Sequence, residues 1–254
     1  MRKPRETMTT TAKVLQVLRL FNEERKQLRA TDVVEILGVS SATAYRYMAD
    51  LEEAGLIERS SVNQYVLGPT IVELDRQIRE NDPLIAAASE IMKTLSERTG
   101  GTALLSRLHG TKVVCVHEVR GRYSPVKVSY ERGRAMPLYR GATSKIILAH
   151  LDADTVREIT KNDAAALRKA GLPTSFDTLS NLLAALRANK VCATSGEVDR
   201  EVMGWAAAIH HGRQLLGSLS VVMSKAAPSP NPQRIADQLL RAALRIEGRL
   251  EAPR

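Results

Sequence analysis

The sequence is poor in cysteine. Of its 254 residues only Cys115 and Cys192 are cysteines, and they lie far apart and match no metal-ligand spacing. This excludes a disulfide framework and a cysteine-based zinc site as the basis of the fold. Two isolated thiols of this kind are expected to be structural and suit a reducing compartment, so we expect a cytoplasmic protein.

Long apolar runs are also missing. No window approaches the roughly 18 consecutive apolar residues of a membrane-spanning helix. The basic start MRKPRETMTTTAK has no apolar segment after it, so we expect neither a membrane partner nor a secretory signal. With 44% hydrophobic and 26% charged residues, the composition is that of a soluble globular protein. Its length suits one large domain or two ordinary ones.

The common motifs of catalysis are absent. The chain has no G-x-S-x-G, no H-E-x-x-H and no glycine-rich phosphate loop. Cys115 and His117 alternate along one expected strand and so would share a face, but such pairs more often serve packing. An enzyme acting on an anionic substrate stays open as an alternative, with nucleophile or base candidates Cys115, Cys192, His117, His210 and His211. We expect no catalytic residues, no metal site and no cofactor.

The positive charge is unevenly distributed. The formal net charge is +9. Residues 1–80 hold 12 Lys and Arg against 12 Asp and Glu, whereas residues 81–254 hold 25 against 16. The excess therefore lies wholly in the C-terminal part, which either meets anions or has a basic surface. Any argument for DNA binding by the N-terminal part must rest on its motif.

The clearest pattern runs from Thr31 to Leu67 and predicts a helix, a tight turn, a second helix and two short strands. A preceding helix is expected from about Thr11 to Asn22, ended by the polar stretch NEERKQLRA. Thr31 would cap the short helix, and Gly38 stands where a helix end favours positive φ. The side chains of this short helix expected to face inward are Val33, Val34, Ile36 and Leu37.

Ser40 or Ser41 would cap the next helix, which runs to about Ala54. Its apolar face, expected to pack in the core, consists of Ala44, Tyr47, Met48 and Leu51. The opposite face begins with small residues and would let the backbone approach base edges in a major groove. Arg46 would read guanine or grip a phosphate, and the sequence leaves both open. The candidate DNA contacts on this helix are Ser41, Ala42, Thr43, Tyr45 and Arg46.

Two short strands, LIER at 56–59 and QYVL at 64–67, follow Gly55 and are joined by a polar tip. A strand pair in this position is typical of the wing of a winged helix-turn-helix. Arg59, Ser61 and Asn63 are candidate contacts to phosphate or the minor groove. A helix-turn-helix used for protein contacts is the alternative, but the three-helix order, the caps and the wing favour DNA.

The remainder predicts a larger second domain. A charged connecting helix is expected from Thr70 to Glu80, and Asp82-Pro83 is a strong helix start. Strand-like segments from residue 102 onward alternate with helices near 142–151, 152–169, 175–189 and 232–250, which favours an antiparallel-leaning sheet and an α+β class. We predict a DNA-binding domain at 1–68, a linker helix at 69–81 and a sensor and oligomerisation domain at 82–254.

Several stretches resemble the IclR-type transcriptional regulators. They are V-L-x-V-L-x-L-F, SSATAYRYMADLEEAGLIER and QYVLG, then GRAMPLYRGATSKIILA and SGEVDREVMGWAAAIHHGRQLLGSLSV. The resemblance covers nearly the whole chain in the right order, which makes it more specific than a lone helix-turn-helix. It implies a winged helix-turn-helix, a linker helix and a GAF-like effector-binding domain. It also implies a regulator that binds a double-stranded DNA operator as a homodimer or a dimer of dimers.

The resemblance further implies a pocket for a small organic acid or aromatic metabolite. By residue-by-residue match, the amides of Ala142 and Thr143 would meet its carboxylate, and free N–H groups at a helix start suit an anion. The other implied pocket residues are Pro125, Val128, Thr194, Val202, Gly204 and Ser220. The sequence departs from the family where Ala142-Thr143-Ser144-Lys145 replaces Gly-Ala-Gly-Lys, and where Thr194 and Gly204 replace an acidic residue and a cysteine. These changes predict a roomier pocket and a larger or aromatic acid.

Two further residues and one further function stay open. Lys145 would neutralise a bound acid, point to solvent or pair with a carboxylate. Trp205, the only tryptophan, is expected in the core or an interface, unless it borders the pocket. A C-terminal domain that only oligomerises is the alternative to a ligand sensor, although the polar strand-to-helix turn argues against it.

Overall fold

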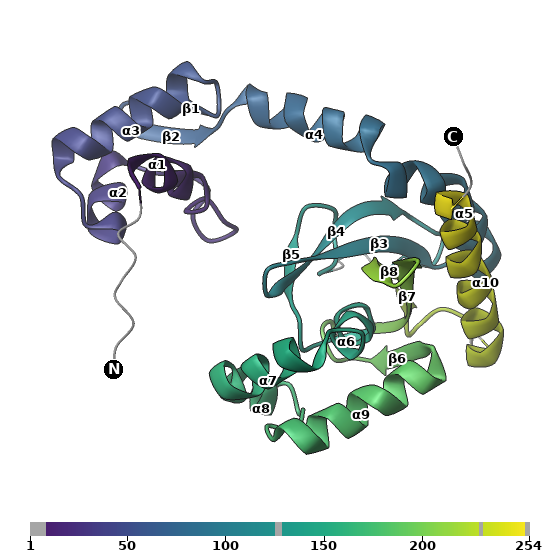
Figure 1. The fold of residues 1–254 in the computed structure, drawn as a ribbon. Helices are drawn as coiled ribbons and strands as arrows, with labels where there is room; N and C mark the ends of the chain where they lie inside the picture. The colour runs from purple at the N-terminus through teal and green to yellow at the C-terminus, as the bar shows by residue number, and fades with distance from the viewer. Residues whose placement is uncertain (1–8, 125–128, 229–230, 252–254) are drawn as a thin grey trace. The chain divides into compact units, whose positions relative to one another are not determined.

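A computed structural model describes residues 9–124, 129–228 and 231–251 and divides into two compact units between Asn81 and Asp82 (Figure 1). Within these residues, the first unit contains a two-stranded sheet and the second a six-stranded sheet. The helix-turn-helix and the α+β class predicted from the sequence are both present.

The first unit is built on three helices and a hairpin. Its elements are α1 (Thr10–Leu18), α2 (Ala30–Leu37), α3 (Ser41–Glu53), β1 (Ile57–Ser61), β2 (Gln64–Leu67) and α4 (Pro69–Asn81). The predicted apolar face of α3 is buried in the core with Val33 of α2 and with Ile57 and Tyr65 of the hairpin. Gly38 ends α2 at φ 64°, as predicted. The strict helical spacing of these apolar residues explains why three short helices share one core.

Three local expectations in this unit were wrong. α1 ends at Leu18 and not at Asn22, because the Asn22 side chain accepts the N–H groups of Glu24 and Arg25 and makes a turn. α2 begins one residue before Thr31, and the Asp32 carboxylate accepts the Arg29 N–H at 2.7 Å, so Thr31 is not the cap. Ile36, expected inside, is 43% exposed.

The second unit begins with α5 (Pro83–Thr99), whose start was predicted correctly. Asp82 accepts the N–H of Leu84, and Pro83 occupies the first helical turn. The remaining elements are β3 (Thr102–His109), β4 (Lys112–Val119), β5 (Ala135–Pro137), α6 (Ala142–Ala149), α7 (Ala153–Asn162), α8 (Ala164–Lys169), α9 (Phe176–Asn189), β6 (Val191–Ser195), β7 (Val202–His211), β8 (Gln214–Ser224) and α10 (Pro232–Glu251).

All neighbouring strands of the six-stranded sheet are antiparallel, in the order β5-β4-β3-β8-β7-β6. The predicted helix at 152–169 is two helices, α7 and α8, which meet at Asp163. The Asp163 carboxylate accepts the Tyr139 hydroxyl at 2.5 Å. This contact comes from outside the helices, so helical periodicity could not indicate the break.

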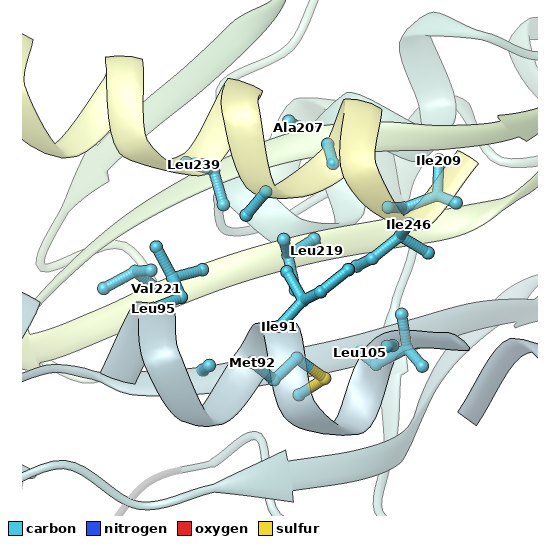
Figure 2. Packing of buried hydrophobic residues seen from close by; sticks show 14 of the residues in the cluster. Ile91, Met92, Leu95, Leu105, Ala207, Ile209, Leu219, Val221, Leu239 and Ile246 are labelled. Carbon is cyan, nitrogen blue, oxygen red and sulfur yellow. The ribbon is translucent and has the colours of Figure 1, made fainter. Parts of the chain in front are cut away.

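Helices cover both faces of the sheet (Figure 1). On one face, α5 and α10 pack against β3, β7 and β8, where Ile91, Leu239 and Ile246 meet Leu105 and Leu219 (Figure 2). Alternation along β7 turns Trp205 into this layer, where it is 5% exposed. Trp205 is therefore a core residue, as expected.

The opposite face is covered mainly by α6, with α7, α8 and α9 packed on it. Gly204, the neighbour of Trp205 on β7, faces this side of the sheet. A Cβ added at Gly204 would lie near Val222, Ala142 and Thr194. The start of α6 thus lies over β8, β7 and β6, which positions the candidate effector site.

A bulge in the β3–β4 ladder corrects another expectation. The register shifts between Leu105 and Ser106, which pair with His117 and Cys115. Cys115 therefore packs with Leu104 on the α6 side of the sheet, whereas His117 Nε2 lies 3.4 Å from Ser89 Oγ of α5 on the other side. The two residues do not share a face, since the extra bulge residue breaks the two-residue alternation.

Of the helices that the structure describes, none combines the length and apolar character needed to cross a membrane.

Candidate DNA-binding and effector sites

The exposed face of α3 contains most of the residues proposed to contact DNA. Ser41, Ala42, Tyr45 and Arg46 are exposed, and Tyr45 is 51% exposed. Within the described residues, Arg46 makes no hydrogen bond or ion pair, so its guanidinium is available to a base or a phosphate. The N-terminal end of this helix carries the partial positive charge of its first N–H groups, which suits a phosphate.

Thr43 differs from its four neighbours, because it belongs to the helix cap. Its N–H donates to Ser40 Oγ at 3.3 Å, and its hydroxyl lies 2.9 Å from the same oxygen. Of the two serines considered, Ser40 is therefore the cap and Ser41 is the first helical residue. Thr43 is half-buried and fixes the start of the helix.

The wing residues are exposed, and Arg59 and Ser61 already have side-chain partners in the first unit. Arg59 Nε lies 3.0 Å from Glu52 Oε1 of α3, and the guanidinium is 5.5 Å from the Tyr65 ring centroid. The Glu52 carboxylate raises the pKa of Arg59. Ser61 Oγ donates to Gln64 Oε1 at 3.0 Å, and Asn63 adopts φ 63° at the tip. Exposed pairs of this kind exchange readily for a phosphate partner.

A third segment pairs with one of the two strands of the wing, and the sequence did not lead us to expect it. Leu28 and Tyr65 exchange two backbone hydrogen bonds of 2.9 Å, so the loop before α2 pairs with β2. Leu28 is fully buried. This loop brings Arg25, Lys26 and Arg29 to the hollow that Gln64 also lines, together with Glu23, Glu24 and Asp32. Leu28, the one large apolar residue within NEERKQLRA, was the only signal of the pairing.

The second site lies where β5 leads into α6. Gly141 precedes the helix with φ 80°, a conformation that side-chain-bearing residues rarely adopt. A Cβ there would fall 2.6 Å from the Tyr130 hydroxyl and 2.9 Å from Val198. Glycine is therefore required both by the turn and by the close approach of these side chains.

The chain itself supplies partners to the first amides of this helix start. The Ala142 N–H donates to Thr194 Oγ1 at 3.1 Å, and the Gly141 N–H donates to Glu197 Oε2 at 3.0 Å. Lys145 Nζ lies 2.6 Å from Glu197 Oε1. Of the three roles considered for Lys145, the structure shows pairing with a carboxylate.

Buried hydroxyl groups surround the same turn. Thr143 Oγ1 and Ser220 Oγ lie 2.8 Å apart, and Ser218 Oγ donates to the Thr143 carbonyl at 3.2 Å. The Tyr130 hydroxyl donates to the Arg140 carbonyl at 2.8 Å. Burial raises the pKa of Tyr130 to about 12, so its phenol stays a neutral donor. These bonds fix the helix start to β8 and to the segment before β5.

The cavity at this turn has a volume of only about 20 Å³. That is room for about one water molecule, which needs roughly 10–15 Å³. The residues described here thus enclose a smaller space than the roomier pocket expected from the sequence. The lining residues are Tyr130, Gly141, Ala142, Thr143, Thr194, Glu197, Val198, Asp199, Val202, Gly204 and Val222.

Five of the eight expected pocket residues line this cavity: Ala142, Thr143, Thr194, Val202 and Gly204. Ser220 does not line it but holds the Thr143 hydroxyl. Pro125 and Val128 lie outside the described residues. The expected set missed Tyr130, Glu197 and Asp199, and the acidic stretch SGEVDREV before β7 was the available signal for the last two.

The residues considered for catalysis do not form a reactive group. Burial raises the pKa of Cys115 to about 12 and that of Cys192 to about 11, so both are neutral thiols. The bulge in β4 separates Cys115 from His117. Among the residues that the structure describes, no three His, Cys, Asp or Glu side chains are grouped to hold a metal ion.

Comparison with known proteins identifies both units. The family model of the IclR helix-turn-helix domain matches residues 10–61, and that of the bacterial transcriptional regulator IclR C-terminal domain matches residues 77–247. The HTH-type transcriptional regulator XynR of Escherichia coli (strain K12) is 25% identical over 245 residues, covering 95% of this chain and 96% of XynR.

Solved structures agree over almost the whole chain. An IclR transcriptional regulator from Silicibacter sp. TM1040 is 26% identical with a TM-score of 0.79, covering 96% of this chain and 97% of that one. An IclR homolog from Microbacterium hydrocarbonoxydans, solved with 4-hydroxybenzoate, is 22% identical with a TM-score of 0.77 and shares the fold over 96% of this chain and 100% of its own. The chain therefore belongs to the IclR family and is a DNA-binding transcriptional regulator, not an enzyme, with an N-terminal helix-turn-helix and a C-terminal effector domain.

Proposed function

We propose that operator binding by this regulator responds to a small organic acid, aromatic acids included, held at the start of α6. One observation carries the proposal: this turn already binds a carboxylate. Glu197 accepts the Gly141 N–H at 3.0 Å and pairs with Lys145 at 2.6 Å. An amide at a helix N-terminus together with a cation suits any carboxylate. The relative that was solved with 4-hydroxybenzoate supports an acid of this class.

The acid would be held by the residues that converge on this turn. The amides of Ala142 and Thr143 would receive its carboxylate, with Thr194 and Ser220 as hydroxyl partners. Val202 and Gly204 would flank its apolar body, and we retain Pro125 and Val128 as proposed wall residues from the family resemblance.

On the DNA side, we propose that α3 enters the major groove and the wing contacts the backbone. Ser41, Ala42, Tyr45 and Arg46 would lie nearest the bases, with Thr43 fixing the helix start. Arg59, Ser61 and Asn63 would reach phosphate or the minor groove from the wing. We assign DNA binding to residues 1–68, the linker to 69–81, and effector binding with oligomerisation to 82–254.

We further propose that the protein acts as a homodimer or a dimer of dimers. Residues 1–80 carry no net charge, so one head has little electrostatic attraction for DNA. Two linked heads on adjacent half-sites would bind far more tightly than one. The linker helix α4 exposes Val72, Leu74 and Ile78, of which the last two are four residues apart and share a face.

Fluorescence anisotropy on DNA from the promoter regions beside the gene tests the proposal. We expect tight binding to one fragment and a change in affinity with at least one member of a panel of aliphatic and aromatic acids. An effector shifts the balance only through its different affinity for the two states. Failure to bind any neighbouring promoter would disprove regulation at that locus, and binding insensitive to every acid would disprove the effector class.

A ligand-free oligomerisation domain is the second candidate, and the cavity of about 20 Å³ favours it. Scanning fluorimetry against the same acids separates the two functions. A rise in melting temperature with one acid supports the sensor. Unchanged melting curves with intact operator binding support the ligand-free domain.

A further inference from the structure

The carboxylate of Glu197 lies at the start of α6, on the amide directly before those proposed to receive an acid. It comes from the turn between β6 and β7, 56 residues after Gly141 in sequence. One oxygen accepts the Gly141 N–H at 3.0 Å, and the other lies 2.6 Å from Lys145 Nζ. Arg140 also donates from its guanidinium to the Glu197 carbonyl. The amide and the cation that suit an effector are therefore both in use.

We propose that Glu197 is an internal carboxylate that competes with the effector acid for the start of α6 and so determines which acids the site accepts. The inference rests on the proposed function, because it concerns the same site. The cavity beside Glu197, about 20 Å³, holds no more than a water molecule. An acid can enter only when the Glu197 carboxylate leaves.

Exchange of one carboxylate for another is electrostatically balanced. The Glu197 side chain is 33% exposed and regains water when it turns outward, whereas the Lys145 side chain is only 15% exposed and needs a counter-charge. Departure of Glu197 without a replacement would leave Lys145 and the Gly141 N–H without partners, which is unfavourable. An incoming carboxylate restores both interactions, so the site opens only in exchange for an acid.

The exchange also explains selectivity. Acetate brings only the group that Glu197 already supplies and loses its freedom of movement on binding, so it gains nothing. An acid with an apolar body gains additional burial against Val198, Val202 and Val222, which line the cavity. Competition from Glu197 therefore lowers the apparent affinity for every acid and leaves only those with an apolar body able to bind.

The other end of the same turn is held separately. The Asp199 carboxylate accepts the Ser129 N–H at 2.9 Å and the Ser129 hydroxyl at 2.5 Å. These bonds, and the bond from Arg140 to the Glu197 carbonyl, do not involve the Glu197 side chain, so the turn stays attached when that side chain leaves. A change at residue 197 should therefore free the helix start without releasing the whole turn.

Acetate rescue of Glu197→Ala in the full-length protein is the direct test. Acetate should raise the melting temperature of this variant by roughly 2–4 °C at saturation relative to chloride of equal ionic strength. The wild type should show no such difference. Glu201→Ala, in the same turn and exposed, has no side-chain partner among the described residues and is the matched control that should behave like the wild type.

Benzoate provides a second readout. Its affinity should rise about tenfold or more in Glu197→Ala, and the preference for benzoate over acetate should shrink. If Glu197→Ala does not fold, Glu197→Gln takes its place in the acetate test. The glutamine side chain keeps the size of glutamate and an acceptor for the Gly141 N–H, but it removes the negative charge. That variant should still show an acetate response above the wild type. Equal responses to acetate and chloride in the variant that folds would overturn the inference.

The outcomes separate this inference from the proposed function. Acetate rescue with operator binding insensitive to all acids would uphold Glu197 as the internal carboxylate and overturn the acid response. An acid response on the operator without acetate rescue would overturn the role of Glu197 and leave the proposed function standing.

Discussion

The proposed DNA-binding face and the proposed effector site differ in how their polar groups are paired. On α3, Tyr45 is half exposed, and Arg46 has no hydrogen-bond or ion-pair partner among the described residues. At the start of α6, the Gly141 amide, Lys145 and the Thr143 hydroxyl each have a partner within the chain. The polar groups of the first surface are open to a partner, and those of the second are already paired within the chain.

Burial explains the difference. Polar groups on a convex, exposed helix remain hydrated until DNA replaces the water, so they need no protein partner. Polar groups beneath a sheet and a turn lose water on folding and must be paired. A surface site can therefore be recognised by polar side chains that have no partner in the protein. A buried site must be recognised by hydrogen bonds and ion pairs within the protein that a ligand could replace.

The largest effect should come from removing core packing beneath the open site. Leu51→Ala, at a buried position of α3, should cost about 2–5 kcal/mol of the unfolding free energy of the first unit. Because the two units have separate cores, the melting of the second should be unchanged. Differential scanning calorimetry measures both transitions. Glu53→Ala, exposed on the same helix, is the control, and a single joint transition would refute independent units.

Arg46→Ala should weaken operator binding by about 1–3 kcal/mol without changing the melting temperature, because the side chain has no partner in the described structure. Anisotropy at several salt concentrations distinguishes its two possible roles. Loss restricted to the specific site indicates guanine reading, and a lower salt dependence on all DNA indicates a phosphate contact. Unchanged affinity would remove Arg46 from the DNA interface.

Gly141→Ala should destabilise the second unit by about 2–3 kcal/mol through positive φ and the approach of Tyr130 and Val198. Gly212→Ala is the matched control, because it also has positive φ but no atom within 4 Å of the added Cβ. It should cost only about 1 kcal/mol. Urea denaturation compares the two variants, and equal losses would show that the start of α6 is not closely packed.

The smallest effect concerns pH. Burial, with the charges of His210 and Arg187, lowers the pKa of His150 to about 4. Since the unfolded ring titrates at about pH 6.5, the stability that comes from neutral His150 is fully present above that pH and is lost as the pH falls toward 4. Because the ring is partly exposed, we expect about 1 kcal/mol between pH 7 and 4. His150→Gln should remove this part of the dependence in urea titrations, and a slope identical to that of the wild type would contradict it.

Local features were determined by the sequence alone. The serine cap of α3, the glycine at position 38 and the Asp82-Pro83 start all act within one helical turn, so neighbouring residues suffice to predict them. The choice between Ser40 and Ser41 as the cap came from the structure. The buried face of α3 follows from helical periodicity in the same way. The resemblance to the family added one prediction that local patterns do not give, namely a candidate anion site at the start of α6.

Only the tertiary structure decided which distant groups meet. The pairing of Leu28 with Tyr65, the separation of Cys115 from His117 by a bulge, and the contact of Glu197 with the start of α6 all depend on strand register or on turns far apart in the chain. Local periodicity contains no information about such partners, because a register shift of one residue reverses which side a residue faces. The sequence thus proposed two candidate sites, and the tertiary structure decided that the polar groups of one are exposed and those of the other are paired within the chain.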